Sequence, residues 1–132
     1  MDEVRHFKRG EMRFVPLQAP LAPEGPAVAE IARLIGPAES RSLGVGIGRF
    51  EAPIDWAVHY DEMMVVLQGR FRVTLADRTI EAGPGDVIWV PEGTRFTTAG
   101  ENAVVCYALW PVDYRERTVK AERLMDSDKP GR

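Results

Sequence analysis

Two stretches of the sequence decide the fold, Trp56–Gly69 (WAVHYDEMMVVLQG) and Gly85–Phe96 (GDVIWVPEGTRF). The first is rich in β-branched and aromatic residues, and apolar side chains stand on both faces of the strand it would form. The second begins in a Gly-Pro-Gly-Asp turn that leads into the short apolar run Val87–Val90. These features predict β-strands joined by tight turns. Because both faces of the first strand are partly apolar, we expect it to be buried on both sides.

The same pattern extends outward from these two stretches. Twelve glycines and ten prolines cut the chain into short segments, which is typical of strands and turns. Seven short candidate strands predict an antiparallel sandwich or barrel; they are Ser42–Phe50, Trp56–Leu67, Arg70–Leu75, Arg78–Ala82, Val87–Val90, Phe96–Thr98 and Ala103–Trp110. The segment Val28–Ile35 fits a helix or a strand equally well.

Length, charge and cysteine content exclude several classes of protein. A chain of 132 residues suits one domain. Its longest apolar run, Ala103–Trp110, has eight residues, whereas a membrane-spanning helix needs about 20. The formal net charge is −3 and no dense basic block occurs, so we expect neither membrane nor nucleic-acid partners. The single cysteine, Cys106, and the charged N-terminus favour a cytoplasmic protein.

The spacing in the two stretches resembles the two motifs of the cupin superfamily. Six residues separate Glu62 from Gly69, and five separate Gly85 from Pro91. The string Trp-x-x-x-Tyr-Asp-Glu, together with a Trp-Pro pair near the end, is similar to the ethanolamine utilization EutQ group. The resemblance implies an all-β, single-domain cupin, a double-stranded β-helix or jelly-roll barrel. Its core would span 42–112, with an N-terminal arm (1–41) completing the barrel or a dimer and a short polar C-terminal tail (113–132).

The positions of the metal ligands in cupins carry other residues here. Metal-binding cupins have two histidines shortly before the motif glutamate and a third at the position of Phe96. In this chain Trp56 and Val58, or Asp55 and Ala57, stand at the first two positions. Three or more convergent ligands are the usual minimum for a transition-metal site. We therefore expect no metal and no cofactor.

The motif glutamate of cupins points into the barrel, which would turn Trp56 and Tyr60 inward with Glu62. A carboxylate inside a barrel needs a partner, either a cation, a protein Arg or Tyr, or a ligand. His59 lies on the other strand face, so it is either a partly exposed residue near the barrel mouth or part of the pocket. We expect a small-molecule site with six candidate ligand-binding residues: Trp56, Tyr60, Glu62, Phe96, His59 and Asp61.

Three glycines, Gly44, Gly46 and Gly48, share one face of a candidate strand. That face leaves room either for a ligand in the barrel or for a bulky neighbour such as Trp89 or Trp56.

Three functions are compatible with these features. The first is a metal-poor EutQ-like cupin that binds a small polar, cationic or hydroxylated molecule and serves an accessory role in ethanolamine-type catabolism. The second is an enzyme, either of the acetate kinase type that the EutQ resemblance implies, with Asp61 and Glu62 on magnesium, or a cupin with an atypical metal site. The sequence supplies no nucleotide motif, and no catalytic residue can be named. The third is a structural or regulatory dimeric partner.

A homodimer is expected in each case, because cupins commonly dimerise by exchanging N-terminal strands. The segment Arg13–Leu17 suits such an exchanged strand, or an edge strand of the barrel.

Overall fold

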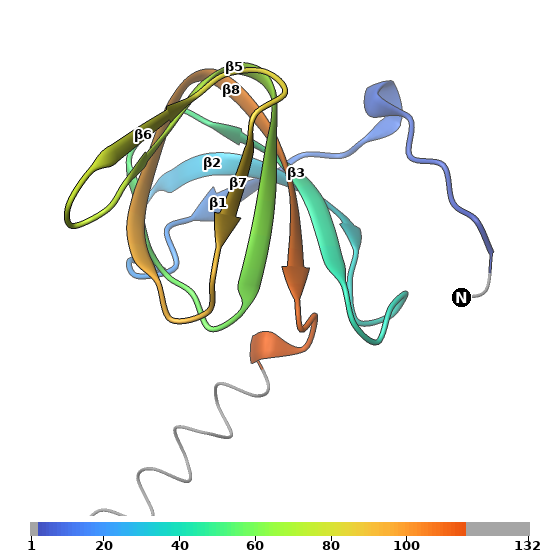
Figure 1. The fold of residues 1–132 in the computed structure, drawn as a ribbon. Coiled ribbons are helices and arrows are strands. Elements are labelled where there is room, and N and C mark those ends of the chain that lie inside the picture. The colour runs from blue at the N-terminus through green and yellow to red at the C-terminus, as the bar shows by residue number, and fades with distance from the viewer. Residues whose placement is uncertain (1–2, 116–132) are drawn as a thin grey trace, which may run out of the picture.

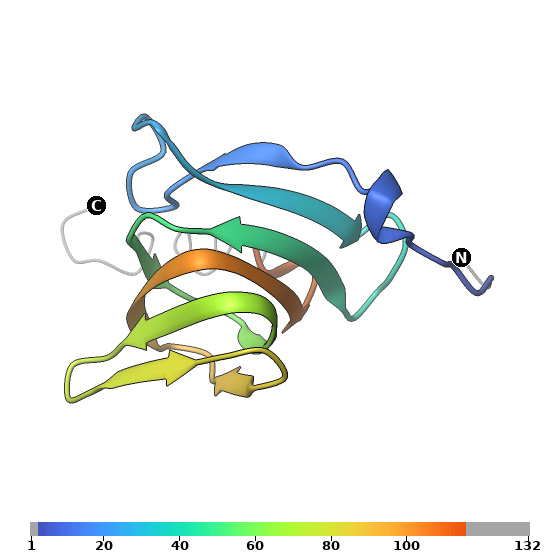
Figure 2. The same cartoon turned by 90° about the horizontal axis from the view of Figure 1, so that it is seen from above.

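The computed structural model describes residues 3–115 and forms a strongly curved antiparallel β-sheet (Figure 1). Its strands are β1 (Val15–Gln18), β2 (Ala27–Ile35), β3 (Gly44–Phe50), β4 (Ile54–Ala57), β5 (Asp61–Thr74), β6 (Thr79–Ala82), β7 (Val87–Val90) and β8 (Arg95–Trp110), preceded by a short 3₁₀ turn, η1 (Arg9–Glu11). The strand order is β1-β2-β3-β8-β5-β6, with β4 paired to β8 and β7 paired to β5. Seen from above, β1 and β2 form one edge of the structure and β6 and β7 the opposite side (Figure 2). The predicted all-β class is confirmed.

The two longest strands, β5 and β8, organise the barrel and differ from the predicted segmentation. Each replaces two predicted pieces, because the chain bends without leaving the hydrogen-bonded ladder. In β5 the bend falls at Gly69, where the register shifts and φ is +76°. A left-handed backbone of this kind is readily adopted only by glycine. A Cβ at Gly69 would also overlap the backbone of Asn102, so the glycine permits a bulge where a turn was expected.

The predicted strand Trp56–Leu67 is interrupted at residues 58–60. Before the break, β4 pairs with the first part of β8, and after it β5 pairs with the last part of β8. The break is held by Val58, whose N–H donates to the carbonyl of Thr94 and whose carbonyl accepts from the N–H of Gly93. The chain therefore crosses from one end of β8 to the other at this point.

The segment whose sequence suited a helix or a strand is β2. Its neighbours β1 and β3 hydrogen-bond to its two sides, and the adjacent Ile31 and Ala32 are both buried. The backbone N–H and C=O groups on both edges of β2 thus find hydrogen-bond partners in neighbouring strands, which favours a strand over a helix for this segment. The edge strand β1 contains Val15 and Leu17 of the expected N-terminal strand, and in the described residues it pairs with β2 of its own chain.

The inner face of β5 belongs to the core and the outer face does not. Tyr60 and Glu62 are buried, as the resemblance to cupins implied, and so is Met64 on the same face, whereas Met63 and Leu67 are each 40% exposed. The expectation that this strand is buried on both sides is therefore wrong. Around Met63 and Leu67 the outer face of the barrel wall is therefore open to solvent.

The glycine face of β3 accommodates bulky side chains of the barrel interior. A Cβ at Gly46 would overlap the ring and hydroxyl of Tyr107, and one at Gly48 would overlap Phe50. The two tryptophans named as candidate neighbours do not fill this space, since Trp89 is exposed and Trp56 stacks on Phe96. No helix within residues 3–115 is long and apolar enough to span a membrane.

Candidate functional site

Glu62 is the only charged residue in the buried core of residues 3–115. It stands second in β5, where it lies opposite Val90 of β7 and Leu109 of β8. Its side chain lies on the inner face of the curved sheet, where Tyr60 and Met64 are also buried, and Glu62 is only 9% exposed. Among residues 3–115, no group donates a hydrogen bond to its carboxyl and no cationic side chain forms an ion pair with it. The site is thus built around an unpaired buried carboxyl.

Three tyrosines, which we call the tyrosine cluster, surround this region: Tyr60, Tyr107 and Tyr114. Tyr60 lies just before β5 on the inward face and is buried. Its ring packs against Tyr114, with ring centroids 4.3 Å apart. Tyr107, on β8, occupies the space that Gly46 leaves on the facing strand. Tyr107 and Tyr114 are partly exposed, so the cluster extends from the buried interior toward the surface.

Burial raises the pKa of the Glu62 carboxyl from 4.5 to about 7, because desolvation disfavours the charged form. Burial is also the main cause of the raised pKa values of Tyr60 and Tyr107, and the negative charge of Glu62 raises both further. For Tyr107 the pKa reaches about 12. Two arginines at the periphery act in the opposite sense, since Arg115 lowers the pKa of both tyrosines and Arg33 that of Tyr107. Near neutral pH the site therefore combines a partly ionised carboxyl with neutral phenols.

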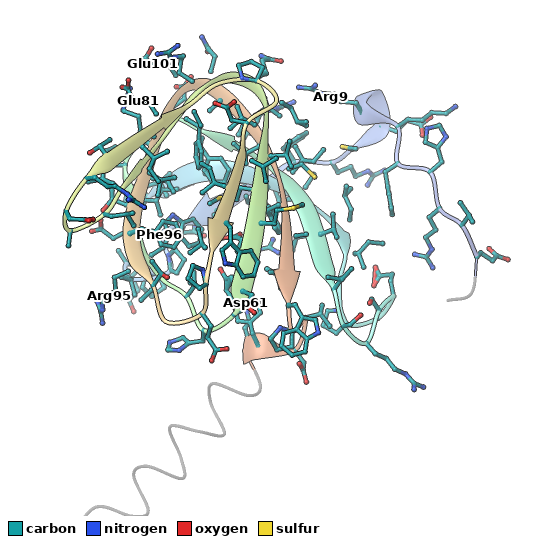
Figure 3. The ribbon with its side chains drawn as sticks, viewed as in Figure 1. Arg9, Asp61, Glu81, Arg95, Phe96 and Glu101 are labelled. Atoms are coloured by element: carbon teal, nitrogen blue, oxygen red, sulfur yellow. The ribbon has the colours of Figure 1, made fainter. Side chains whose placement is uncertain are left out.

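Trp56 and Phe96 form a separate contact group. Their rings stack with centroids 6.3 Å apart, and the Trp56 Nε1–H donates to the Thr98 hydroxyl over 2.9 Å. Both line an open recess of about 310 Å³ whose other described lining residues are Leu21, Asp55, Thr74, Leu75, Arg95 and Thr97. In Figure 3 Phe96 lies on the same side of the barrel as Arg95, while Asp61 lies at the lower end of β5. Neither Tyr60 nor Glu62 lines this recess.

His59 and Asp61 point away from Glu62. His59 is exposed in the turn before β5. The Asp61 carboxylate accepts a hydrogen bond from the backbone N–H of Glu92 over 2.9 Å, which ties the start of β5 to the loop after β7. In the part of the chain that is described, no three His, Cys, Asp or Glu side chains group closely enough to hold a metal ion.

Of the six residues expected at one site, only Tyr60 lies with Glu62 in the interior, while Trp56 and Phe96 stack on each other at a separate recess. The reasoning from sequence missed Tyr107 and Tyr114. The signal for Tyr107 was the glycine at position 46, which predicts a bulky neighbour without saying which one. Tyr114 lies after the last strand, and no periodic pattern marks it.

Comparison with known proteins assigns this chain to a family. A model of the family described as ethanolamine utilisation protein EutQ matches residues 22–116, more than two thirds of the chain. This chain belongs to the EutQ family. A curated member, the acetate kinase EutQ of Clostridioides difficile (strain 630), is 30% identical over 78 residues, which are 58% of this chain and 50% of that protein. The chain therefore spans about half the length of that relative.

Solved structures confirm the predicted cupin fold. The Clostridium difficile EutQ structure superposes with a TM-score of 0.61 at 27% identity, over 65% of this chain and 64% of that one. An RmlC-like cupin from Shewanella frigidimarina gives the same TM-score at 14% identity, over 84% and 95% of the two chains. At that identity the likeness concerns the fold alone. The EutQ family and the cupin barrel are thus as the sequence motifs predicted.

Proposed function

We propose that this EutQ-family cupin binds a small protonated amine that also carries a hydroxyl group, of the ethanolamine type, and serves an accessory role in its catabolism. The observation that carries the proposal is the buried Glu62 carboxyl, which has no hydrogen-bond or ion-pair partner within residues 3–115. An unpaired buried carboxylate is costly, and a cationic ligand would offset that cost.

The tyrosine cluster supports the choice of a hydroxylated cation. Aromatic rings attract cations through their π-faces, by about 0.5–1 kcal/mol at exposed sites and about 2 or more when desolvated. Phenol groups both donate and accept hydrogen bonds, so neutral Tyr60 and Tyr107 suit a ligand hydroxyl. An anionic ligand would instead meet the negative charge of Glu62. The cluster reaches from the buried Tyr60 to the partly exposed Tyr107 and Tyr114.

Calorimetric titration at pH 8 tests this proposal. Ethanolamine should bind, whereas ethylene glycol, which lacks the ammonium group, should bind at least tenfold more weakly. Glu62→Gln should lose about 30-fold or more in affinity for ethanolamine, corresponding to about 2 kcal/mol. Glu51→Gln, at an exposed carboxylate, serves as the matched control and should bind like the wild type. Equal affinities of the wild type and Glu62→Gln would contradict the proposal.

The affinity should also depend on pH in a defined direction. A cation stabilises the ionised carboxylate, so binding lowers the pKa of Glu62 from about 7 and releases a proton. Apparent affinity for ethanolamine should therefore rise about tenfold from pH 6 to pH 8. Glu62→Gln should show no such rise.

The second candidate is phosphoryl transfer to acetate, which is suggested by the name of the curated relative. Asp61 and Glu62 are neighbours in β5 and face opposite sides, so they do not converge on one magnesium ion. A coupled assay that measures ADP formation from ATP in the presence of acetate tests this candidate. A rate that disappears in Glu62→Gln but persists in Glu51→Gln would favour the kinase, and no rate above background would reject it for this chain.

A further inference from the structure

One row of residues on the inner face of the sheet connects β2 to the candidate site. Strands β2, β3, β8 and β5 lie side by side in that order (Figure 2). The register places Arg33 of β2 opposite Gly46 of β3, and Gly46 opposite Tyr107 of β8. Tyr107 in turn lies opposite the buried Met64 of β5. Residues directly opposite one another share a face of the sheet, so Arg33 stands on the same face as Tyr107 and Met64.

The burial of β2 agrees with this placement of Arg33. Ile31, two residues before it, belongs to the buried core, and alternate residues of a strand share a face. Gly46 has no side chain to separate Arg33 from Tyr107. The Tyr107 hydroxyl lies so close over Gly46 that a Cβ there would overlap it. The phenol therefore reaches toward β2, where Arg33 is exposed.

Tyr107 has opposite charges on its two sides. Glu62 lies in the next inward-facing row, two residues along β5 from the partner of Tyr107. The positive charge of Arg33 lowers the pKa of Tyr107 and the negative charge of Glu62 raises it, so both charges act on the same phenol. The Arg33 side chain forms neither an ion pair nor a hydrogen bond with a group of residues 3–115, in contrast to Arg49, Arg70 and Arg72, which pair with glutamates.

The span between Arg33 and β5 suits a ligand whose two charges are apart. Arg33 lies three strands from β5, and neighbouring strands are about 4.8 Å apart, so its Cα is about 14 Å from that strand along the sheet. Two long inward side chains on a curved sheet shorten this span, yet no ion pair joins Arg33 to Glu62. A molecule with one charge can meet only one of these two groups.

We propose that the site takes a small zwitterion, whose ammonium group contacts Glu62 and whose anionic group, a phosphate or a carboxylate, contacts Arg33, with the Tyr107 phenol between them. The proposal rests on the amine site proposed above and adds the second half of the ligand. A guanidinium group can donate two parallel hydrogen bonds to a phosphate or a carboxylate. An amino alcohol whose hydroxyl is esterified with phosphate has this chemistry, and so does a short amino acid.

Arg115 is the other arginine whose charge acts on Tyr107. Its Nε–H already donates to the Tyr114 hydroxyl over 3.1 Å, whereas the donors of Arg33 are free within residues 3–115. Arg33 is therefore assigned as the anion-binding residue.

Calorimetric titration of the full chain at pH 8 with ethanolamine, O-phosphoethanolamine and β-alanine tests the proposal. One or both zwitterions should bind at least ~tenfold more tightly than ethanolamine, and the tighter one identifies the anionic group. Arg33→Gln should abolish this advantage while the affinity for ethanolamine stays within about twofold of the wild type. Arg33→Lys, which keeps the charge but not the planar fork, should retain part of it. Arg78→Gln removes an exposed arginine of the β5–β6 turn and is the matched control for net charge.

The outcomes separate the anionic half of the site from the amine half. If neither zwitterion binds more tightly than ethanolamine, or if the advantage persists in Arg33→Gln, the role of Arg33 is overturned while ethanolamine binding through Glu62 stands. An equal loss in Arg78→Gln would reveal a general effect of charge and would also overturn it. Loss of the advantage in Arg115→Gln but not in Arg33→Gln would overturn it in favour of Arg115. Failure of all three probes to bind the wild type would contradict the amine site as well.

Discussion

Replacing Glu62 by glutamine should change how the stability of the protein depends on pH. Burial raises the pKa of this carboxyl from 4.5 to about 7 in the folded protein, whereas the unfolded chain retains the ordinary value. Below about pH 4.5 the carboxyl is protonated in both the folded and the unfolded state, and its burial as a neutral group does not make the free energy of unfolding depend on pH. Between pH 4.5 and 7 the unfolded chain loses its proton first, so the free energy of unfolding falls as the pH rises.

The size of the effect follows from that difference. At about 1.4 kcal/mol per pH unit, the rise to about 7 corresponds to about 3 kcal/mol of lost stability at pH 8. The amide of a glutamine side chain cannot ionise and avoids this loss, so Glu62→Gln should be more stable than the wild type at pH 8 by up to about 3 kcal/mol. For a domain of this length that amounts to roughly 10 °C in Tm. At pH 4.5 the two proteins should unfold almost alike.

Urea denaturation at closely spaced pH values between 4.5 and 8 measures this difference, with the ligand absent. Glu51→Gln removes an exposed carboxylate and controls for the change in net charge. Its stability should follow that of the wild type across the range. The reasoning would be refuted if the Glu62→Gln and wild-type curves ran parallel, or if Glu62→Gln were the less stable protein at pH 8.

Three further predictions follow from the packing and from the motif positions. Gly46→Ala places a methyl group against Tyr107 and should lower the free energy of unfolding by about 1–3 kcal/mol; Gly83→Ala, which has open space, should change it by less than about 0.5 kcal/mol. Trp56→Phe removes the hydrogen bond to the buried Thr98 hydroxyl and should cost about 1–3 kcal/mol in urea denaturation, part of which the double variant with Thr98→Val should restore. Elemental analysis after dialysis should find no stoichiometric iron, manganese, nickel or zinc, because Trp56 and Val58, or Asp55 and Ala57, together with Phe96, stand at the positions at which metal cupins have histidines; about one equivalent of any of these metals would contradict this.

The period of two along the strand was sufficient to place Tyr60, Glu62 and Met64 on one face, and the resemblance to cupins predicted that this face turns inward. The alternation through Tyr60, Glu62 and Met64 is the alternation of burial in the structure, and Val87–Val90 is a strand with the predicted bounds. These properties depend on the period of two along a single strand, which neighbouring residues encode directly. The spacings in the two motifs around Glu62 and Pro91 likewise identified the family, because the number of residues between motif positions can be counted in the sequence without a structure.

Pairing between strands that lie far apart in the sequence decided the other features of the fold and the make-up of the candidate site. Whether Ala27–Ile35 is a strand depended on β1 and β3 being available on its two sides, and the joining of two predicted strands into β5 depended on a bulge that only Gly69 permits. The candidate site was affected most. Tyr107 reaches the region of Glu62 because its register on β8 places it opposite Met64, two residues along β5 from Glu62, whereas Phe96, on the same strand, pairs with Trp56. Register is set by hydrogen bonds and packing between residues far apart in sequence, so only the tertiary structure could determine which side chains meet.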